Sequence, residues 1–166
     1  MYTDKVIKHF RYPKNYGRIK NPDGIGKVGN VVCGDVMWLY IKVAINKRKQ
    51  EIISDIKFET FGCVAAIATS NMIADLAKNQ PLNRALEISK EKIVKSLGGL
   101  PPVKLHCSVL AADALSEAIY DYYSKNKRQI AADLLKRHQR IMKEREIIEE
   151  KYKDWVDTEE KMHQHG

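Results

Sequence analysis

Two adjacent prolines, Pro101 and Pro102, precede a His–Cys pair and the longest stretch of the chain without Gly or Pro. Proline fixes its own backbone angle, lacks an N–H, and biases the preceding residue away from the helical region, so an extended segment is predicted here. The uninterrupted stretch that follows predicts a helix, with His106 and Cys107 at its start. The positive end of a helix dipole favours a thiolate, and a thiolate beside an imidazole can hold a soft metal.

The hydrophobic pattern before this segment changes from a helical period to a period of two and back again. Thr3 and Ser89 are suitable N-caps for two short helices. Three alternating runs joined by short turns predict an antiparallel meander. The expected strands span 25–32, 35–45 and 52–61, and the expected helices span 3–11, 64–77, 82–88, 89–97 and the residues after Cys107. The predicted fold class is therefore α+β, with a three-stranded antiparallel sheet packed against helices.

The chain divides into a domain of residues 1–126 and a charged, amphipathic helical extension of residues 127–166. In the extension, apolar residues recur every seven positions at Leu134, Ile141, Ile148 and Trp155, with charges of both signs between them. A helix with this spacing has one apolar stripe, which either folds back on the domain or meets another chain. The terminal histidines His163 and His165 are expected to lie in a frayed tail, with metal binding as the minor alternative.

Three cysteines, Cys33, Cys63 and Cys107, are too few and too far apart for a disulfide framework, which favours reduced thiols and a cytoplasmic protein. Each one falls at a junction between predicted elements. Asp35 is two residues from Cys33, and His106 adjoins Cys107. Three thiolates, a carboxylate and an imidazole suit zinc or an iron–sulfur cluster better than calcium or magnesium. The alternative is that the cysteines are three small buried hydrophobes.

The formal net charge of +8 is concentrated in the first thirty residues. Such a basic face could meet an acidic protein or bind nucleic acid without specificity, but a solvated face is the preferred interpretation. The sequence has none of the motifs of specific nucleic-acid binding and no apolar run that could span a membrane, and residues 1–5 are not expected to begin a signal peptide. We therefore expect neither a specific nucleic-acid partner nor a membrane association.

Four motifs resemble those of a known protein family and occur in the same order along the chain as in that family. They are Tyr-Pro-Lys-Asn-Tyr-Gly at 12–17, Cys-Gly-Asp-Val-Met at 33–37, Phe-Glu-Thr-Phe-Gly-Cys at 58–63, and Leu-Pro-Pro-Val-Lys-Leu-His-Cys-Ser at 100–108. From about residue 2 to 126 the chain resembles the IscU/NifU-type iron–sulfur cluster assembly scaffolds. The resemblance implies a SufE/IscU-like α+β fold and a scaffold function rather than an enzymatic one.

The same resemblance implies a site and its partners. Cys33, Cys63 and Cys107, with Asp35 or His106 as the fourth ligand, are expected to bind iron and sulfur and to assemble a transient 2Fe–2S cluster. Cys107 is expected to be the primary persulfide acceptor. The implied partners are a cysteine desulfurase and apo iron–sulfur proteins, and self-association into a homo-oligomer stays open.

Two further roles are expected in the segment that precedes the His–Cys pair. Leu100, Pro101, Pro102, Val103 and Lys104 correspond to the segment that a DnaK-type chaperone binds in the IscU branch. Lys104 is an additional candidate for steering the persulfide or an acidic partner, with a solvated lysine as the alternative.

Two other functions remain as alternatives. The same ligands could bind zinc tetrahedrally, as in a SufU-like sulfurtransferase. That branch has an insertion before its third cysteine and lacks the adjacent histidine, so the short Cys63–Cys107 interval and His106 favour the IscU/NifU side. The weaker alternative is a structural adaptor that uses the basic face and the C-terminal helix.

Overall fold

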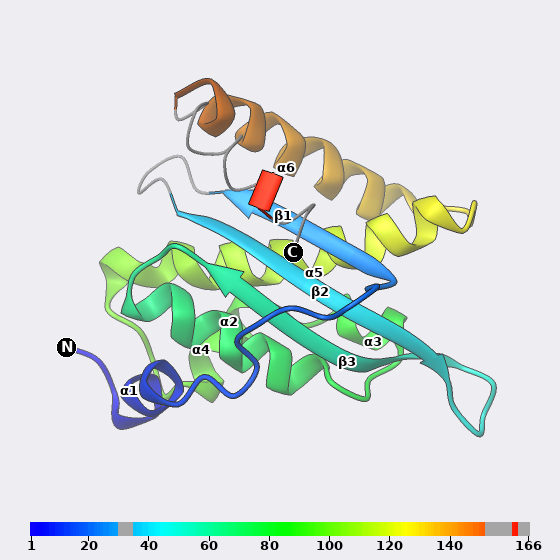
Figure 1. Ribbon diagram of the computed structural model, residues 1–166. Coiled ribbons are helices and arrows are strands. Elements are labelled where there is room, and N and C mark those ends of the chain that lie inside the picture. The colour runs from blue at the N-terminus through cyan, green and yellow to red at the C-terminus, as the bar shows by residue number, and fades with distance from the viewer. Residues whose placement is uncertain (30–34, 152–160, 163–166) are drawn as a thin grey trace.

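The structure is a computed structural model that describes residues 1–29, 35–151 and 161–162, without the side chains of residues 148 and 151. Its strands are β1 (Gly24–Gly29), β2 (Val36–Ile45) and β3 (Glu51–Thr60). Its helices are α1 (Asp4–Arg11), α2 (Val64–Ala77), α3 (Leu82–Ala85), α4 (Lys90–Ser96), α5 (Leu105–Lys125) and α6 (Ala132–Lys151), with a 3-10 turn η1 (Pro102–Lys104) before α5. The strands form one antiparallel sheet in the order β1-β2-β3 (Figure 1), which confirms the predicted fold class.

The two faces of β2 are both buried, but in different surroundings. Met37, Leu39 and Ile41 point into the main core, which the sheet shares with α2, α4 and α5. The alternate residues Val36, Trp38 and Tyr40 form a second buried cluster on the other face, against Ile19. This alternation follows from the period of two along a strand and was predicted from the sequence.

Helix α5 lies directly against β1 because both surfaces carry very small residues. A Cβ atom added at Gly24 or Gly26 would collide with the backbone carbonyls of Ala118 and Ala114. The methyl groups of Ala111, Ala114 and Ala118 are fully buried in the resulting core. Close approach of helix and sheet therefore fixes the position of α5, including its N-terminal end.

The helix ends mostly follow their predicted caps. Thr3 accepts a hydrogen bond from the N–H of Val6 at the start of α1, and Ser89 accepts one from Lys92 at the start of α4. Helix α3 is shorter than predicted, ending at Ala85 rather than continuing to Ile88. The first strand is described through Gly29, and the rest of its predicted range lies outside the described residues.

The extended conformation predicted for the proline segment is only partly correct. Pro101 is extended, with φ −55° and ψ 140°, but Pro102 begins the 3-10 turn that runs to Lys104 and leads into α5. Proline is compatible with the first turn of a helix because its fixed φ suits the helix and the missing N–H would lack an intrahelical partner there. His106 and Cys107 are therefore the second and third residues of α5.

The C-terminal extension folds back on the domain through α6, which contacts α5 and β1 (Figure 1). Leu134 and Ile141 of the predicted stripe are buried. Arg140 Nη2 lies 2.8 Å from an Asp113 carboxylate oxygen, and His138 Nδ1 lies 2.8 Å from Glu117 Oε2. Of the other stripe residues, the Ile148 side chain and Trp155 lie outside the described part of the chain, as do His163 and His165.

Candidate metal centre

Three separate chain segments meet at one end of the sheet. Asp35 immediately precedes β2, Cys63 is the N-cap residue of α2, and His106 and Cys107 lie in the first turn of α5. Antiparallel pairing places the start of β2 beside the end of β3, where the Phe61 N–H donates to the Val36 carbonyl at 3.2 Å. The junction that follows β3 therefore lies next to the residue that precedes β2.

Gly62 is necessary for this close approach. A Cβ atom at position 62 would lie 2.5 Å from Ala66 Cβ and 3.3 Å from Asp35 Cγ. The first separation is far below any ordinary carbon–carbon contact, so a side chain here would displace α2 or the Asp35 carboxylate. Gly62 thus lets the carboxylate and the start of α2 share the space around the thiols.

The gathered side chains are of metal-ligating types. One ligand atom from each of Asp35, His106 and Cys107 lies within 4.8 Å of the other two, and Asp35 and Cys107 are buried. The Cys63 Sγ atom lies 3.9 Å from the Cys107 Sγ atom. Thiolate and imidazole donors are typical of zinc and iron sites, whereas magnesium and calcium prefer oxygen ligands. The donor set therefore fits a soft or borderline metal.

The environment of Cys63 favours its thiolate. A hydrogen bond with the Cys107 thiol lowers the pKa of Cys63 to about 5, although partial burial acts in the opposite direction. The N–H groups of Ala66 and Ala65 at the start of α2, and the charge of Lys104, contribute to the same lowering of the pKa. The sequence predicted that both Cys63 and Cys107 stand at helix N-termini, and the surroundings of Cys63 in the structure favour its thiolate.

Cys107 itself is enclosed. Its exposed fraction is 0%, and it lies in a small apolar cluster with Ala65 and Ala66, which Tyr2 and Leu100 border. The Thr69 hydroxyl lies 2.8 Å from the Ala65 carbonyl and 3.2 Å from the Cys107 carbonyl. This side chain links α2 to the first turn of α5 and so helps to hold the two thiols side by side.

The structure brings together four of the five predicted ligands: Asp35, Cys63, His106 and Cys107. The fifth, Cys33, lies outside the described residues. Two contributors were missed from the sequence, Gly62 as a close-contact position and Thr69 as a link between helices. The proximity of Gly62 to Asp35 depends on strand pairing, which the sequence around Gly62 does not show. The only sequence feature that could have pointed to Gly62 is its position next to Cys63.

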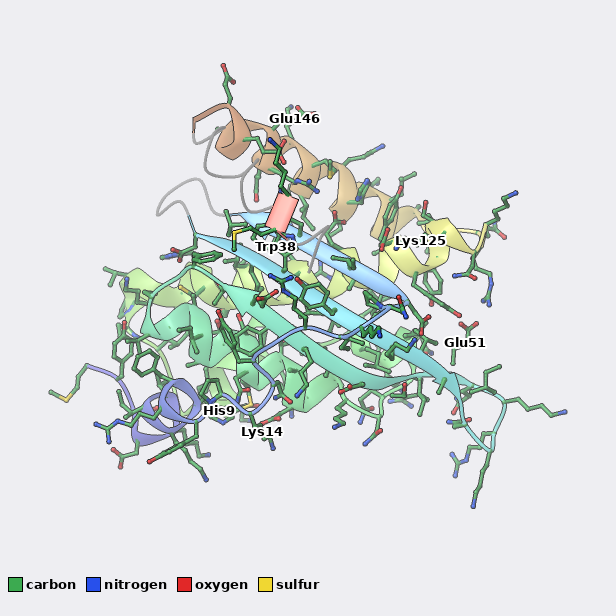
Figure 2. All side chains as sticks on the ribbon, viewed as in Figure 1. His9, Lys14, Trp38, Glu51, Lys125 and Glu146 are labelled. Atoms are coloured by element: carbon green, nitrogen blue, oxygen red, sulfur yellow. The ribbon has the colours of Figure 1, made fainter. Side chains whose placement is uncertain are left out.

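The segment before α5 is partly accessible. Val103 is 76% exposed and Pro102 is also exposed, whereas Leu100 packs against the core. The Nδ1 atom of His9, in α1, lies 2.8 Å from the side-chain amide nitrogen of Asn71 in α2. Figure 2 shows His9 on α1 and Trp38 on the side of the sheet that faces α6.

The chain belongs to the family described as the NifU-like N terminal domain, whose model matches residues 1–129. It is 55% identical over 126 residues to the iron-sulfur cluster assembly scaffold protein IscU 1 of Archaeoglobus fulgidus, which covers 76% of this chain and 79% of that protein. It is 47% identical over 127 residues to the scaffold protein IscU of Azotobacter vinelandii, which covers 75% of this chain and 95% of that one. The predicted family is therefore confirmed.

Solved structures agree on the fold. The N-terminal part of a nitrogen-fixing NifU-like protein from Brucella abortus superposes with a TM-score of 0.56 at 17% identity, covering 74% of this chain and 94% of that one. FiSufU from Fervidobacterium islandicum gives a TM-score of 0.57 at 20% identity, covering 71% and 96%. Among the described residues, no helix is both long and apolar enough to cross a membrane.

Proposed function

We propose that the chain is a scaffold on which iron and sulfur are assembled into a labile 2Fe–2S cluster that is then passed to apoproteins. The observation that carries this proposal is the convergence of the Cys63 and Cys107 thiols with the Asp35 carboxylate and the His106 imidazole. Family membership supports it, because the related scaffolds are named for cluster assembly. The cluster is the cargo of the protein and leaves with the acceptor.

In this proposal Cys33, Cys63 and Cys107 bind the cluster, and Asp35 or His106 completes the ligand set. An oxygen ligand beside thiolates binds iron more weakly than a fourth thiolate would, which suits a cluster that must leave. A desulfurase supplies the sulfur as a persulfide, and Cys107 is the proposed primary acceptor. The buried position of Cys107 means that a donor reaches it only when the surrounding chain moves, whereas Cys63 is partly exposed.

Anaerobic reconstitution with iron, sulfide and a reductant tests the proposal. We expect a red-brown protein with thiolate-to-iron absorption that loses its cluster to an apo-ferredoxin. A chain that stays colourless under these conditions and keeps tightly bound zinc contradicts the proposal. Asp133→Ala, at an exposed position on α6, is a control that removes a carboxylate far from the thiols along the chain.

The role of Asp35 has its own test. Asp35→Ala is expected to slow cluster loss after reconstitution, because it removes the weak oxygen ligand. The decay of the visible absorption on exposure to a chelator measures this, with Asp133→Ala as the matched carboxylate control. Cluster loss as fast as or faster than in the wild type contradicts this role for Asp35.

The second candidate function is a zinc-binding sulfurtransferase that accelerates a desulfurase. The thiolate character of the partly exposed Cys63 favours it, because sulfur transfer requires an accessible thiolate. Its signature would be stimulation of desulfurase turnover by the zinc-loaded chain. Stimulation without any cluster transfer would replace the scaffold proposal.

The proline segment and the extension carry two narrower proposals. Residues 100–104 are proposed to bind a DnaK-type chaperone; Pro102 and Val103 are exposed and offer it a first contact, and a peptide-binding assay would test this. Removal of residues 127–166 tests the adaptor alternative: loss of partner binding with intact cluster assembly would place that role in the extension. The scaffold function also requires reduced thiols, so we propose a cytoplasmic location.

A further inference from the structure

Two thiols from different helices are close enough to react with each other. The Sγ atoms of Cys63, at the start of α2, and Cys107, in the first turn of α5, are 3.9 Å apart. A disulfide requires a sulfur–sulfur distance of about 2.05 Å, so closing the bond takes a movement of about 2 Å. Both residues stand at helix N-termini whose positions the packing of α2 against α5 fixes.

Cluster assembly poses a redox requirement that this pair can meet. The outer sulfur of a persulfide is at the oxidation level of elemental sulfur, and a cluster contains sulfide, so each sulfur must gain two electrons. We propose that Cys63 and Cys107 form an internal dithiol that supplies these two electrons and releases the bound persulfide sulfur as sulfide. This inference rests on the proposed function in one respect, namely that a desulfurase delivers persulfide to the chain.

The step is a thiol–disulfide exchange within the chain. With the persulfide on Cys107, the Cys63 thiolate attacks the Cys107 Sγ atom, a new Sγ–Sγ bond forms, and the bond to the outer sulfur breaks. The bonding electron pair leaves with the outer sulfur as hydrosulfide, so one negative charge enters and one leaves. The two cysteine sulfurs are oxidised to a disulfide while the outer sulfur is reduced. An external dithiol must then supply two electrons to reduce the disulfide before Cys63 and Cys107 can bind iron or accept more sulfur.

The surroundings favour the neighbouring thiol over competitors from solution. Cys107 is fully buried among Ala65 and Ala66, with Tyr2 and Leu100 at the border, so other thiols reach it poorly. A partner held at contact distance reacts with a high effective concentration. The leaving sulfide would be produced close to Asp35 and His106, whose ligand atoms lie within 4.8 Å of each other and of the Cys107 sulfur. Sulfide is thus formed beside the groups that would hold iron.

The forward experiment uses the full chain without iron. A desulfurase and cysteine load the persulfide, the sample is desalted under anaerobic conditions, and released sulfide and remaining persulfide are followed over time. Each cysteine lies on its own tryptic peptide, because lysines stand at 27, 42, 57, 78, 104 and 125, so mass spectrometry identifies the disulfide directly. We expect one sulfide and one Cys63–Cys107 disulfide for each persulfide lost.

Single cysteine variants test whether sulfide release requires both Cys63 and Cys107. In Cys63→Ser and Cys107→Ser, the sulfur that the remaining thiol accepts is expected to stay as persulfide until dithiothreitol is added. Cys33→Ser is the matched variant that removes a cysteine outside the pair, and its sulfide release is expected to follow the wild type even though its cluster yield falls. A wild type that retains persulfide as long as Cys63→Ser does overturns the inference, as does loss of release in Cys33→Ser alone.

The reverse reaction separates this inference from the scaffold proposal. Mild oxidation with diamide is expected to give the Cys63–Cys107 disulfide, and added sulfide is expected to open it to a persulfide and a thiol. This arm needs no desulfurase. If the desulfurase loads no sulfur but the reverse reaction proceeds, the proposed delivery of persulfide by a desulfurase fails and the reactive pair stands. If oxidation links other cysteines, or sulfide leaves the disulfide intact, the inference is wrong.

Discussion

At the seam between α5 and α6, the buried carboxylates of Asp113 and Glu117 each face a basic side chain of α6. Near the N-terminus of the same helix, the buried Cys107 faces a second thiol. At the seam, the Asp113–Arg140 ion pair and the Glu117–His138 contact join the two helices. The thiols, the imidazole and the carboxylate near the N-terminus of α5 are all electron-pair donors. Such groups can coordinate a metal cation together. Along a single helix, the contrast separates a polar cluster that joins two helices from the proposed metal-binding cluster.

Gly62→Ala is expected to have the largest effect on cluster assembly. The effect should be confined to the site around Cys63 and Cys107 and should leave the α5–α6 seam unchanged. The added methyl would lie 2.5 Å from Ala66 Cβ and 3.3 Å from Asp35 Cγ, so either α2 or the carboxylate must move. Overpacking of this kind costs about 1–3 kcal/mol of folding free energy. We also expect cluster yield on reconstitution to fall by more than about tenfold, since donor positions must be accurate to within about 0.5 Å.

A double variant sharpens this prediction. Gly62→Ala with Ala66→Gly removes the colliding methyl and is expected to recover much of the cluster yield. Visible absorption per folded chain after reconstitution measures the recovery. A single Gly62→Ala variant with wild-type yield would show that the close contact does not position the carboxylate.

Asp113→Ala is expected to weaken the contact between α5 and α6 without affecting the site around Cys63 and Cys107. The Asp113 carboxylate pairs with Arg140 at 2.8 Å and with Arg137 at 3.4 Å, and its side chain is only 6% exposed. Loss of these charge-assisted hydrogen bonds is expected to lower the free energy of unfolding by about 2 kcal/mol. Urea denaturation measures the change, with Asp133→Ala as the exposed control. A fall in cluster yield per folded chain would mean that the two regions are coupled.

Glu117→Gln is expected to give the smallest effect, and one that depends on pH. Burial raises the pKa of Glu117 above its ordinary value, although His138 and Arg145 act in the opposite direction. The stability contribution of a carboxyl with a raised pKa is present at low pH and is lost as pH rises through the folded-state pKa. Glutamine does not ionise and avoids that loss. The variant is therefore expected to gain stability relative to the wild type as the pH rises above the ordinary pKa of a glutamate.

The expected difference at neutral pH is within about 1 kcal/mol. Thermal unfolding of both proteins between acidic and neutral pH measures it. A difference that shrinks as pH rises would mean that pairing with His138 outweighs the burial of the charge.

Local patterns in the sequence were enough to predict most of the fold. Capping residues located helix starts at Thr3 and Ser89, and alternation along β2 separated its two buried faces. The proline segment was harder, because Pro102 is equally compatible with an extended chain and with the first residue of a helical turn. The backbone preference of proline does not distinguish these two conformations. The helical turn is adopted because the chain continues directly into α5.

The candidate site was predictable in its residue types but not in its geometry. Cysteines at element junctions, with Asp35 and His106 close by in sequence, pointed to a soft-metal site. Contact between Cys63 and Cys107 depends on how α2 packs beside α5, and 44 positions of sequence separate the two residues. The charged seam was similarly hidden, because the pairing of Asp113 with Arg140 appears only once α6 folds back.

Mössbauer spectroscopy of the anaerobically reconstituted chain tests the central claim most directly, because it reports the ligands of each iron. Three cysteines with Asp35 or His106 would make the two irons of a 2Fe–2S cluster inequivalent, so we expect two resolved quadrupole doublets of equal area. Replacing Asp35 or His106 by alanine is expected to change only the doublet of the iron with the oxygen or nitrogen ligand. A single doublet typical of four sulfur ligands on each iron, or iron bound without sulfide, would contradict the account.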